Sequence, residues 1–198
     1  RMWLATNRGI SSFDPDEVLE GKVDTVFRNY DAKEGLQSNE FHERAAYLGT
    51  TGMILMGGVS GFTTFFPALL AENPAVPPVY LTGLQILNEP VKVGAAGPDG
   101  RVILPKTLNT IEVLDLSHRD YVLTFEFAAL NYTLSEKNRY RYRLEGFDET
   151  WTEAGTRRSV TYTNLDAGAY RFRVQGTNND GRWSPHEALL ALRVAPPP

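Results

Sequence analysis

The feature that most constrains this chain is an internal repeat that aligns without a gap. Residues 3–15 match residues 55–67 at a constant offset of 52 positions, and apolar positions fall opposite apolar positions. The identical pairs are Gly9/Gly61, Phe13/Phe65 and Pro15/Pro67. Self-similarity at a period near 50 residues is typical of folds that repeat one supersecondary unit.

Each copy of the repeat predicts a β-hairpin. An apolar strand, 3–6 or 54–57, leads into a turn that ends at glycine, whose freedom to adopt positive φ suits a tight hairpin. The second strand stops at a proline, which has no backbone donor. Two further strand candidates, 25–30 and 43–48, lie between the copies.

Four short strands in each period of about 50 residues are typical of a β-propeller blade. Because propellers close with several blades, we interpret 1–67 as the C-terminal fragment of a propeller, one blade plus part of another. Such a fragment exposes an apolar edge that favours pairing between chains.

A proline-rich linker is expected at 68–78, and 79–195 follows as an all-β domain. Three of its segments alternate apolar with polar or charged residues, which is typical of half-buried antiparallel strands: 121–128, 140–145 and 170–175. Weaker strand signals lie at 79–87, 101–104, 111–116, 159–164 and 188–194. The fold class is therefore all-β, with an immunoglobulin/fibronectin-III-like antiparallel sandwich after the propeller fragment. One helical turn is expected, at 16–19.

Composition excludes several classes of function. The chain has no cysteine, so it has no disulfide, thiolate metal site or thiol nucleophile. Its formal net charge is −4 without a cluster of basic residues, which argues against nucleic-acid binding. No apolar run reaches the roughly 20 residues of a membrane span. Both ends read as cuts in a longer protein, and 196–198 as the start of a proline-rich linker.

Metal and cofactor chemistry find no support in the sequence. His42, His118 and His186 lack the spacing of metal ligands, so we interpret them as surface or structural residues. Residues 14–17 are acidic but lack the glycine and the bidentate glutamate of a calcium loop. We predict no metal and no cofactor.

Two charged groups invite a functional interpretation. Glu145, Asp148 and Glu149 could suggest the paired acids of a glycosidase, but they read as a polar strand face and a turn. Five arginines would form a basic stripe if the strands near 139–146 and 169–177 share a sheet: Arg139, Arg141, Arg143, Arg171 and Arg173. A sheet face balanced by glutamate is the interpretation we favour over an anion-binding stripe. No catalytic residue is predicted, and no ligand-binding residue is assigned.

Two stretches carry a resemblance to known families. The repeat, together with 35–39, resembles the repeats of the two-component regulator propeller family. Residues 140–151, 162–174 and 178–184 are similar to the Y_Y_Y domain, which is named for three tyrosines and follows such propellers in membrane sensors. The positions that carry this signature are Tyr140, Tyr142, Leu144, Gly146, Trp151, Tyr162, Leu165, Gly168, Tyr170, Phe172, Val174, Gly181 and Trp183. By alternation the tyrosines face the core, which predicts a packing signature and not a ligand site.

The resemblance implies the periplasmic part of an inner-membrane receptor that forms a homodimer. In the family, a transmembrane helix and a cytoplasmic histidine kinase or diguanylate cyclase follow. The propeller would receive a small exported ligand, with carbohydrate as one candidate class, and the fragment itself would not be an enzyme. Two alternatives stay open: a secreted carbohydrate-binding or adhesion module, and an accessory domain of a polysaccharide-degrading enzyme.

Overall fold

The computed structural model describes residues 1–21 and 27–198. They form two compact units, Arg1–Asn73 (unit 1) and Pro74–Pro198 (unit 2). Both are built from β-strands, which confirms the predicted all-β class. Among the described residues, no helix has the length and apolar character that a membrane crossing requires.

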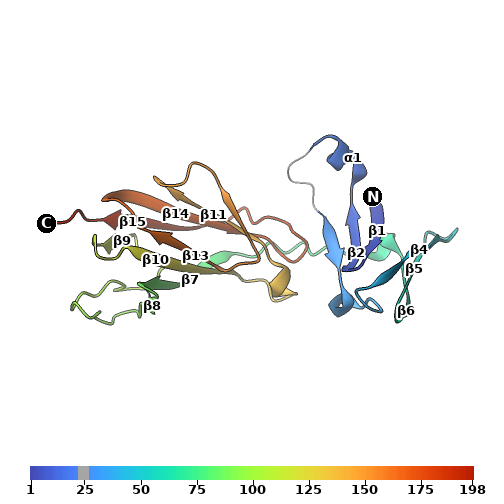
Figure 1. The fold of residues 1–198 in the computed structure, drawn as a ribbon, viewed down its shortest axis with the longest axis horizontal. Helices are drawn as coiled ribbons and strands as arrows, with labels where there is room; N and C mark the ends of the chain where they lie inside the picture. Colours follow the sequence, from blue (N-terminus) through green and yellow to red (C-terminus); the bar gives the residue numbers. More distant parts are fainter. Residues whose placement is uncertain (22–26) are drawn as a thin grey trace. The chain divides into compact units, whose positions relative to one another are not determined.

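Unit 1 contains two three-stranded antiparallel sheets, with the strand orders β1-β2-β3 and β4-β5-β6 (Figure 1). Its elements are β1 (Met2–Thr6), β2 (Gly9–Phe13), α1 (Pro15–Leu19), β3 (Arg28–Tyr30), the 3-10 turn η1 (Ala32–Glu34), β4 (Phe41–Leu48), β5 (Ile54–Gly58), β6 (Gly61–Phe65) and the 3-10 turn η2 (Pro67–Leu69). The start of the predicted strand 25–30 lies outside the described residues, and the remainder forms β3.

The sequence repeat corresponds to two hairpins with the same register. Thr6 pairs with Gly9 in the first, and Gly58 pairs with Gly61 in the second, 52 positions later. Gly9 is required at its position, because its φ is +110° and a Cβ there would lie 2.0 Å from the carbonyl oxygen of Tyr30. The predicted hairpins are therefore confirmed.

Each hairpin ends on a proline that begins a helical turn, where its missing N–H costs nothing. Pro15 opens α1 and Pro67 opens η2. The Asp14 side chain accepts a hydrogen bond from the backbone N–H of Asp16 at 3.1 Å, so it acts as the N-cap of α1. This confirms the helical turn expected at 16–19 and gives the acidic run 14–17 a capping role.

Unit 2 contains a four-stranded sheet, β13-β10-β7-β8, and a five-stranded sheet, β12-β11-β14-β15-β9 (Figure 1). All neighbouring strands are antiparallel except β15 and β9, which are parallel. The strands are β7 (Val79–Ile86), β8 (Glu89–Pro90), β9 (Val113–Leu116), β10 (Val122–Ala129), β11 (Tyr140–Glu145), β12 (Thr152–Gly155), β13 (Ser159–Thr163), β14 (Gly168–Gly176) and β15 (Ala188–Val194), with the 3-10 turn η3 (Ser135–Lys137) between β10 and β11.

One hydrophobic core joins the two sheets of unit 2. Phe125 on β10 and Phe172 on β14 are fully buried, and their rings stack with centroids 4.6 Å apart. Phe127 and Tyr140 extend the same aromatic cluster from opposite sheets, and the Tyr140 hydroxyl accepts a hydrogen bond from the backbone N–H of Ala129 at 3.1 Å. Stacked aromatic side chains of this size dominate the energetics of a core.

The predicted strand at 101–104 is wrong. Val102 forms a single isolated bridge with Ala96, and the segment belongs to the long connection between β8 and β9. Its apolar residues divide between core and surface, because Leu104 is buried while Val102 is 47% exposed. A run of apolar residues therefore forms a loop here and not a strand. The predicted strand 111–116 is also shorter than expected, because β9 begins at Val113.

The segment that precedes β7 is fixed against unit 2. The Asn178 side-chain amide donates to the carbonyl oxygen of Ala75 at 2.9 Å, and the Leu130 N–H donates to that of Pro78 at 3.0 Å. Residues 74–78 are thereby hydrogen-bonded to the loop after β14 in one sheet and to the loop after β10 in the other. Their three prolines had suggested a simple extended spacer.

Candidate functional site

The outer face of β11 and β14 carries a row of charged side chains. On β11 the odd-numbered residues Arg141, Arg143 and Glu145 point away from the core, while Tyr140 and Leu144 are fully buried. In register, Arg141 lies opposite Gln175, Arg143 opposite Arg173, and Glu145 opposite Arg171. The two predicted arginine-rich strands therefore do share a sheet.

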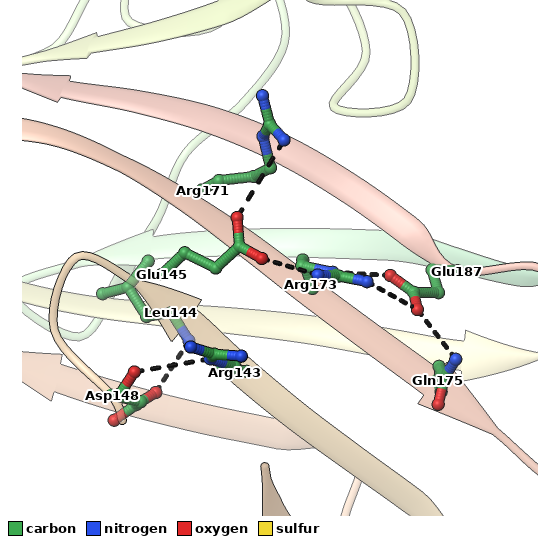
Figure 2. Close-up of polar contacts among 8 residues, drawn as sticks. All are labelled: Arg143, Leu144, Glu145, Asp148, Arg171, Arg173, Gln175 and Glu187. Carbon is green, nitrogen blue, oxygen red and sulfur yellow. Dashed lines mark hydrogen bonds and ion pairs between the residues drawn. The ribbon is translucent and has the colours of Figure 1, made fainter. Parts of the chain in front are cut away.

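Arg173 is the centre of a polar network on this face, which Figure 2 shows. Its guanidinium contacts Glu145 Oε1 at 2.5 Å and both carboxylate oxygens of Glu187, at 2.6 and 2.9 Å. Gln175 donates to Glu187 Oε1 at 2.8 Å and accepts from Arg141 Nε at 2.7 Å. A bidentate guanidinium–carboxylate pair of this kind fixes geometry as well as charge.

The charges of this network compensate one another. Hydrogen bonds from Arg173 hold the pKa of Glu145 below its ordinary value. Hydrogen bonds to Glu187 and then Glu145 raise the pKa of Arg173 above that of a free arginine. The interpretation of a sheet face balanced by glutamate holds for Arg173, which two glutamates pair. Exposed Arg171 reaches Glu145 only at 4.0 Å, and Arg141 and Arg143 donate to neutral groups.

The two tryptophans of the signature lie against the same face. The Arg141 guanidinium sits 4.5 Å from the ring centroid of Trp183 and 5.3 Å from that of Trp151. Arg173 also lies 5.3 Å from the Trp151 centroid. Cations at these distances are attracted to the ring face. Both half-buried indoles thus contact an arginine side chain.

Asp148 has a role that the sequence did not reveal. Its Oδ2 accepts hydrogen bonds from the backbone N–H of Leu144 and from the Tyr162 hydroxyl, each at 2.7 Å. Burial, reinforced by Asp148, raises the pKa of Tyr162 above its ordinary value. One carboxylate therefore links the end of β11 in the five-stranded sheet to β13 in the four-stranded sheet.

The third tyrosine of the signature closes the connection between β13 and β14. The Tyr170 hydroxyl donates to the carbonyl oxygen of Asp166 at 2.9 Å, and half-buried Leu165 packs on the core. This bond resembles the tyrosine corner of immunoglobulin-like sandwiches, in which a tyrosine hydroxyl bonds the backbone a few residues upstream. Gly168 begins β14, two residues before Tyr170.

The remaining signature residues have contacts inside unit 2. Gly146 follows β11 with φ +94°, and a Cβ there would lie 3.0 Å from Tyr170 Cδ1. Gly181 (φ +80°) completes the turn that precedes Trp183. Tyr142 stands edge-on to Tyr162, and Val174 is fully buried. Each of these residues therefore contributes to the turns or the packing of unit 2.

The candidate catalytic and metal-binding residues do not converge. His42, His118 and His186 are exposed on β4, on the turn before β10 and before β15, respectively. Glu149 is exposed in the turn after β11. Across the described residues, no group of three histidine or acidic side chains could hold a metal ion.

Comparisons with known proteins find the same combination of features. Residues 131–195 match the Y_Y_Y domain. The chain is 30% identical over 197 residues to histidine kinase P4 of Formosa agariphila, a match that covers 100% of this chain and 14% of that protein. This chain therefore spans about a seventh of that relative.

Solved structures from B. thetaiotaomicron are similar along almost the whole chain. The extracellular domain of one hybrid two-component system matches with a TM-score of 0.72 and 24% identity, over 98% of this chain and 24% of that one. The extracellular domain of a one-component system matches with a TM-score of 0.53 and 26% identity, again over 98% of this chain and 24% of that one.

The match to the Y_Y_Y domain begins at Asn131 and so covers β11 to β15, the part of unit 2 that holds the charged face, the tyrosine corner and both tryptophans. These residues match the Y_Y_Y domain, in a chain that resembles a segment of a histidine kinase and the extracellular domains of two-component systems.

Proposed function

We propose that this chain is the C-terminal part of the extracellular sensor region of a membrane-bound two-component receptor, and that it takes no part in catalysis. The observation that carries the proposal is the similarity along the full chain to a histidine kinase, over only 14% of that protein's length. A periplasmic location, a transmembrane helix and a kinase or cyclase output domain are parts of the proposal.

Unit 1 fits the end of a β-propeller. The first 52-residue period contains four strands, β1 to β4, of which β4 pairs with the next copy of the hairpin. Each described sheet has three strands, so each is one strand short of a four-stranded blade. Preceding blades would complete the first sheet and cover apolar residues such as Leu48 and Phe62, which are 68% and 66% exposed.

Unit 2 fits an immunoglobulin/fibronectin-III-like sandwich that relays a ligand-induced change. Its two sheets share one aromatic core, and the network around Arg173 ties β11, β14 and the start of β15 together. Such a body moves as a rigid element. A relay further requires two receptor states with different ligand affinity.

The ligand of the receptor is proposed to be a small exported molecule, with carbohydrate as one class. The alternative of a secreted carbohydrate-binding module needs tryptophan faces open to sugar rings. Here both Trp151 and Trp183 lie against Arg141. This arrangement favours the receptor over the binding module.

The test uses the full-length protein that contains this chain, embedded in its membrane. Protease added on the outer side should cleave within 1–198 while the output domain stays intact, and substitution of Arg173 by alanine should alter autophosphorylation or cyclase activity. Arg157→Ala, an exposed arginine outside the network, is the matched control. A secreted protein without an output domain, or a signal that Arg173→Ala and Arg157→Ala leave equally unchanged, would overturn the proposal.

A further inference from the structure

A cavity of about 550 Å³ lies in unit 2, between the β7–β8 hairpin and the loop that follows it. Arg119 and Asp120, from the turn before β10, complete its wall. None of the residues of the charged face in Figure 2 lines this cavity. It is therefore separate from the candidate site described above.

The interior of the cavity is apolar. Ile86 at the end of β7 is buried, and Val91 and Ile103 are half-buried and pack against the core. Pro90 and Pro98 add further apolar wall. Pockets for small organic molecules are mostly apolar and occupy about 300–1,000 Å³, a range that includes this cavity.

One charged group in the wall is already neutralised. Arg101 contacts Asp120 through two nitrogens, at 2.9 and 3.1 Å, and Asp99 at 2.5 Å. Burial raises the pKa of Asp120, but hydrogen bonds from Arg101 and Ser117 outweigh it and keep that pKa below its ordinary value. Arg101 is thus held in the wall by these carboxylates, and its charge is neutralised by them.

Two other cations in the wall are free. Lys92 and Arg119 are exposed, and among the described residues neither side chain has a hydrogen-bond or ion-pair partner. Glu89 is the unpaired acid among the lining residues. The lining therefore holds three cations and three acids, and Lys92 and Arg119 are the two cations left available to an anion beside the apolar interior.

The wall also contains backbone strain. Leu87 and Asn88 form the two-residue turn between β7 and β8, with φ of +53° and +66°. Turns of this type favour Asn-Gly, and a bulky residue at positive φ is an outlier. Strained positions of this kind cluster at ligand sites, and Leu87 is one of the residues that line the cavity.

We propose that this cavity is a binding site for a small amphipathic carboxylate, whose apolar body fills the space lined by Ile86, Val91 and Ile103 and whose carboxylate pairs with Lys92 and Arg119. The site is independent of the ligand that the propeller is proposed to receive. Its two requirements, an apolar body and a negative charge, can be tested separately.

The experiment titrates the full chain with para-trifluoromethylbenzoate and with its uncharged counterpart, para-trifluoromethylbenzyl alcohol, followed by fluorine NMR. We expect saturable binding of the benzoate in the millimolar range or tighter. The double variant Lys92→Ala/Arg119→Ala should weaken benzoate binding about tenfold and leave alcohol binding unchanged, because the charge contacts alone are lost.

A matched control removes the same charge elsewhere. Lys106→Ala/Arg182→Ala changes two exposed residues outside the cavity and should leave benzoate binding unchanged. Ala96→Phe, which fills the cavity, should abolish binding of both probes. The proposal is overturned if the chain does not bind the benzoate saturably, if the two double variants weaken it equally, or if a folded Ala96→Phe variant binds both probes normally.

Discussion

At the scale of single residues, Asp148 determines how the two sheets of unit 2 meet. Its carboxylate accepts hydrogen bonds from β11 and from the Tyr162 hydroxyl. A hydrogen bond to a charged group contributes about 1.5–3 kcal/mol, more than one between neutral groups. Tyr162, buried between Phe125, Tyr142 and Phe172, is therefore fixed by its hydroxyl as well as by its ring.

Tyr162→Phe tests this role. We expect it to lower the free energy of unfolding by about 1.5–3 kcal/mol at neutral pH, since the ring stays and only the hydroxyl is lost. The folded-state pKa of Tyr162 is raised, so its contribution is present below the ordinary value near 10 and is lost at higher pH. Because phenylalanine does not ionise, the free energy of unfolding of the variant should fall less above about pH 10 than that of the wild type. Denaturant titrations at several pH values measure this difference. A variant as stable as the wild type would contradict this role.

Gly146 provides a second prediction at this scale, with Gly155 as its control. Both adopt positive φ, but only at Gly146 would a Cβ press on Tyr170 and on the Ala169 carbonyl oxygen, at 3.0 and 3.2 Å. Gly146→Ala should therefore lower the midpoint of thermal unfolding more than Gly155→Ala does, since about 1 kcal/mol of left-handed strain is common to both. If both variants lowered the midpoint of thermal unfolding equally, packing against Tyr170 would not explain the glycine at position 146.

At the scale of elements, one ion pair holds the loop after β8 to the turn before β10. The Asp120 side chain is 6% exposed and pairs with Arg101, whereas the Asp115 side chain is 63% exposed and pairs with Arg193 at the surface. Partly buried pairs are screened by water much less than exposed ones. The first pair should therefore contribute to stability and the second very little.

This difference predicts a pH dependence. Because the folded-state pKa of Asp120 is lowered, its contribution is complete above the ordinary value near 4 and is lost as pH falls through the folded value. Asp120→Asn should cost about 2 kcal/mol at pH 7 and flatten the decline of stability in acid, whereas Asp115→Asn should change neither. Chemical denaturation at several pH values measures both. An unchanged acid limb in Asp120→Asn would count against the pair.

The elements that could be predicted from sequence are those with two contrasting faces. The predicted segments 140–145 and 188–194 coincide with β11 and β15, because their inward residues are apolar and buried. β12 (Thr152–Gly155) could not be predicted, since it is a polar edge strand with one buried residue. The repeated hairpins were predictable because glycine and proline mark their ends.

The candidate site was only partly predictable for a related reason. Alternation placed the arginines of β11 and β14 on one face. Their partners Glu187 and Gln175 depend on the pairing of β14 with β15, which no local pattern specifies. The cavity depends on the long loop after β8, whose path is set by tertiary contacts such as Arg101–Asp120.

At the scale of the whole molecule, unit 1 exposes apolar side chains that other chains can cover. Tyr47, Leu48 and Phe62 are each more than 60% exposed, at 61%, 68% and 66%. Exposed strand edges and apolar patches favour association. We expect the full chain to form dimers. Light scattering of the full chain and of residues 74–198 alone shows which unit makes the dimer contact.

Two results of that comparison are informative. If the shorter chain is a monomer, unit 1 makes the contact through its exposed apolar side chains. If it is a dimer, unit 2 associates by itself, which supports its proposed relay role. A full chain that stays monomeric at high concentration, with amides of 1–67 protected from hydrogen exchange, would contradict the expectation.

The position of β15 has a mechanical consequence. This strand lies between antiparallel β14 and parallel β9, and the last bond of the ladder joins the Ala195 N–H to the Leu116 carbonyl oxygen at 2.9 Å. Tension applied to the chain beyond Ala195 is therefore resisted along both edges of one strand. The backbone hydrogen bonds to β14 and β9 are then loaded simultaneously, in shear. They do not break one after another, as they would if the strand were pulled away sideways. Unit 2 is consequently stiff in the direction in which its last strand is pulled.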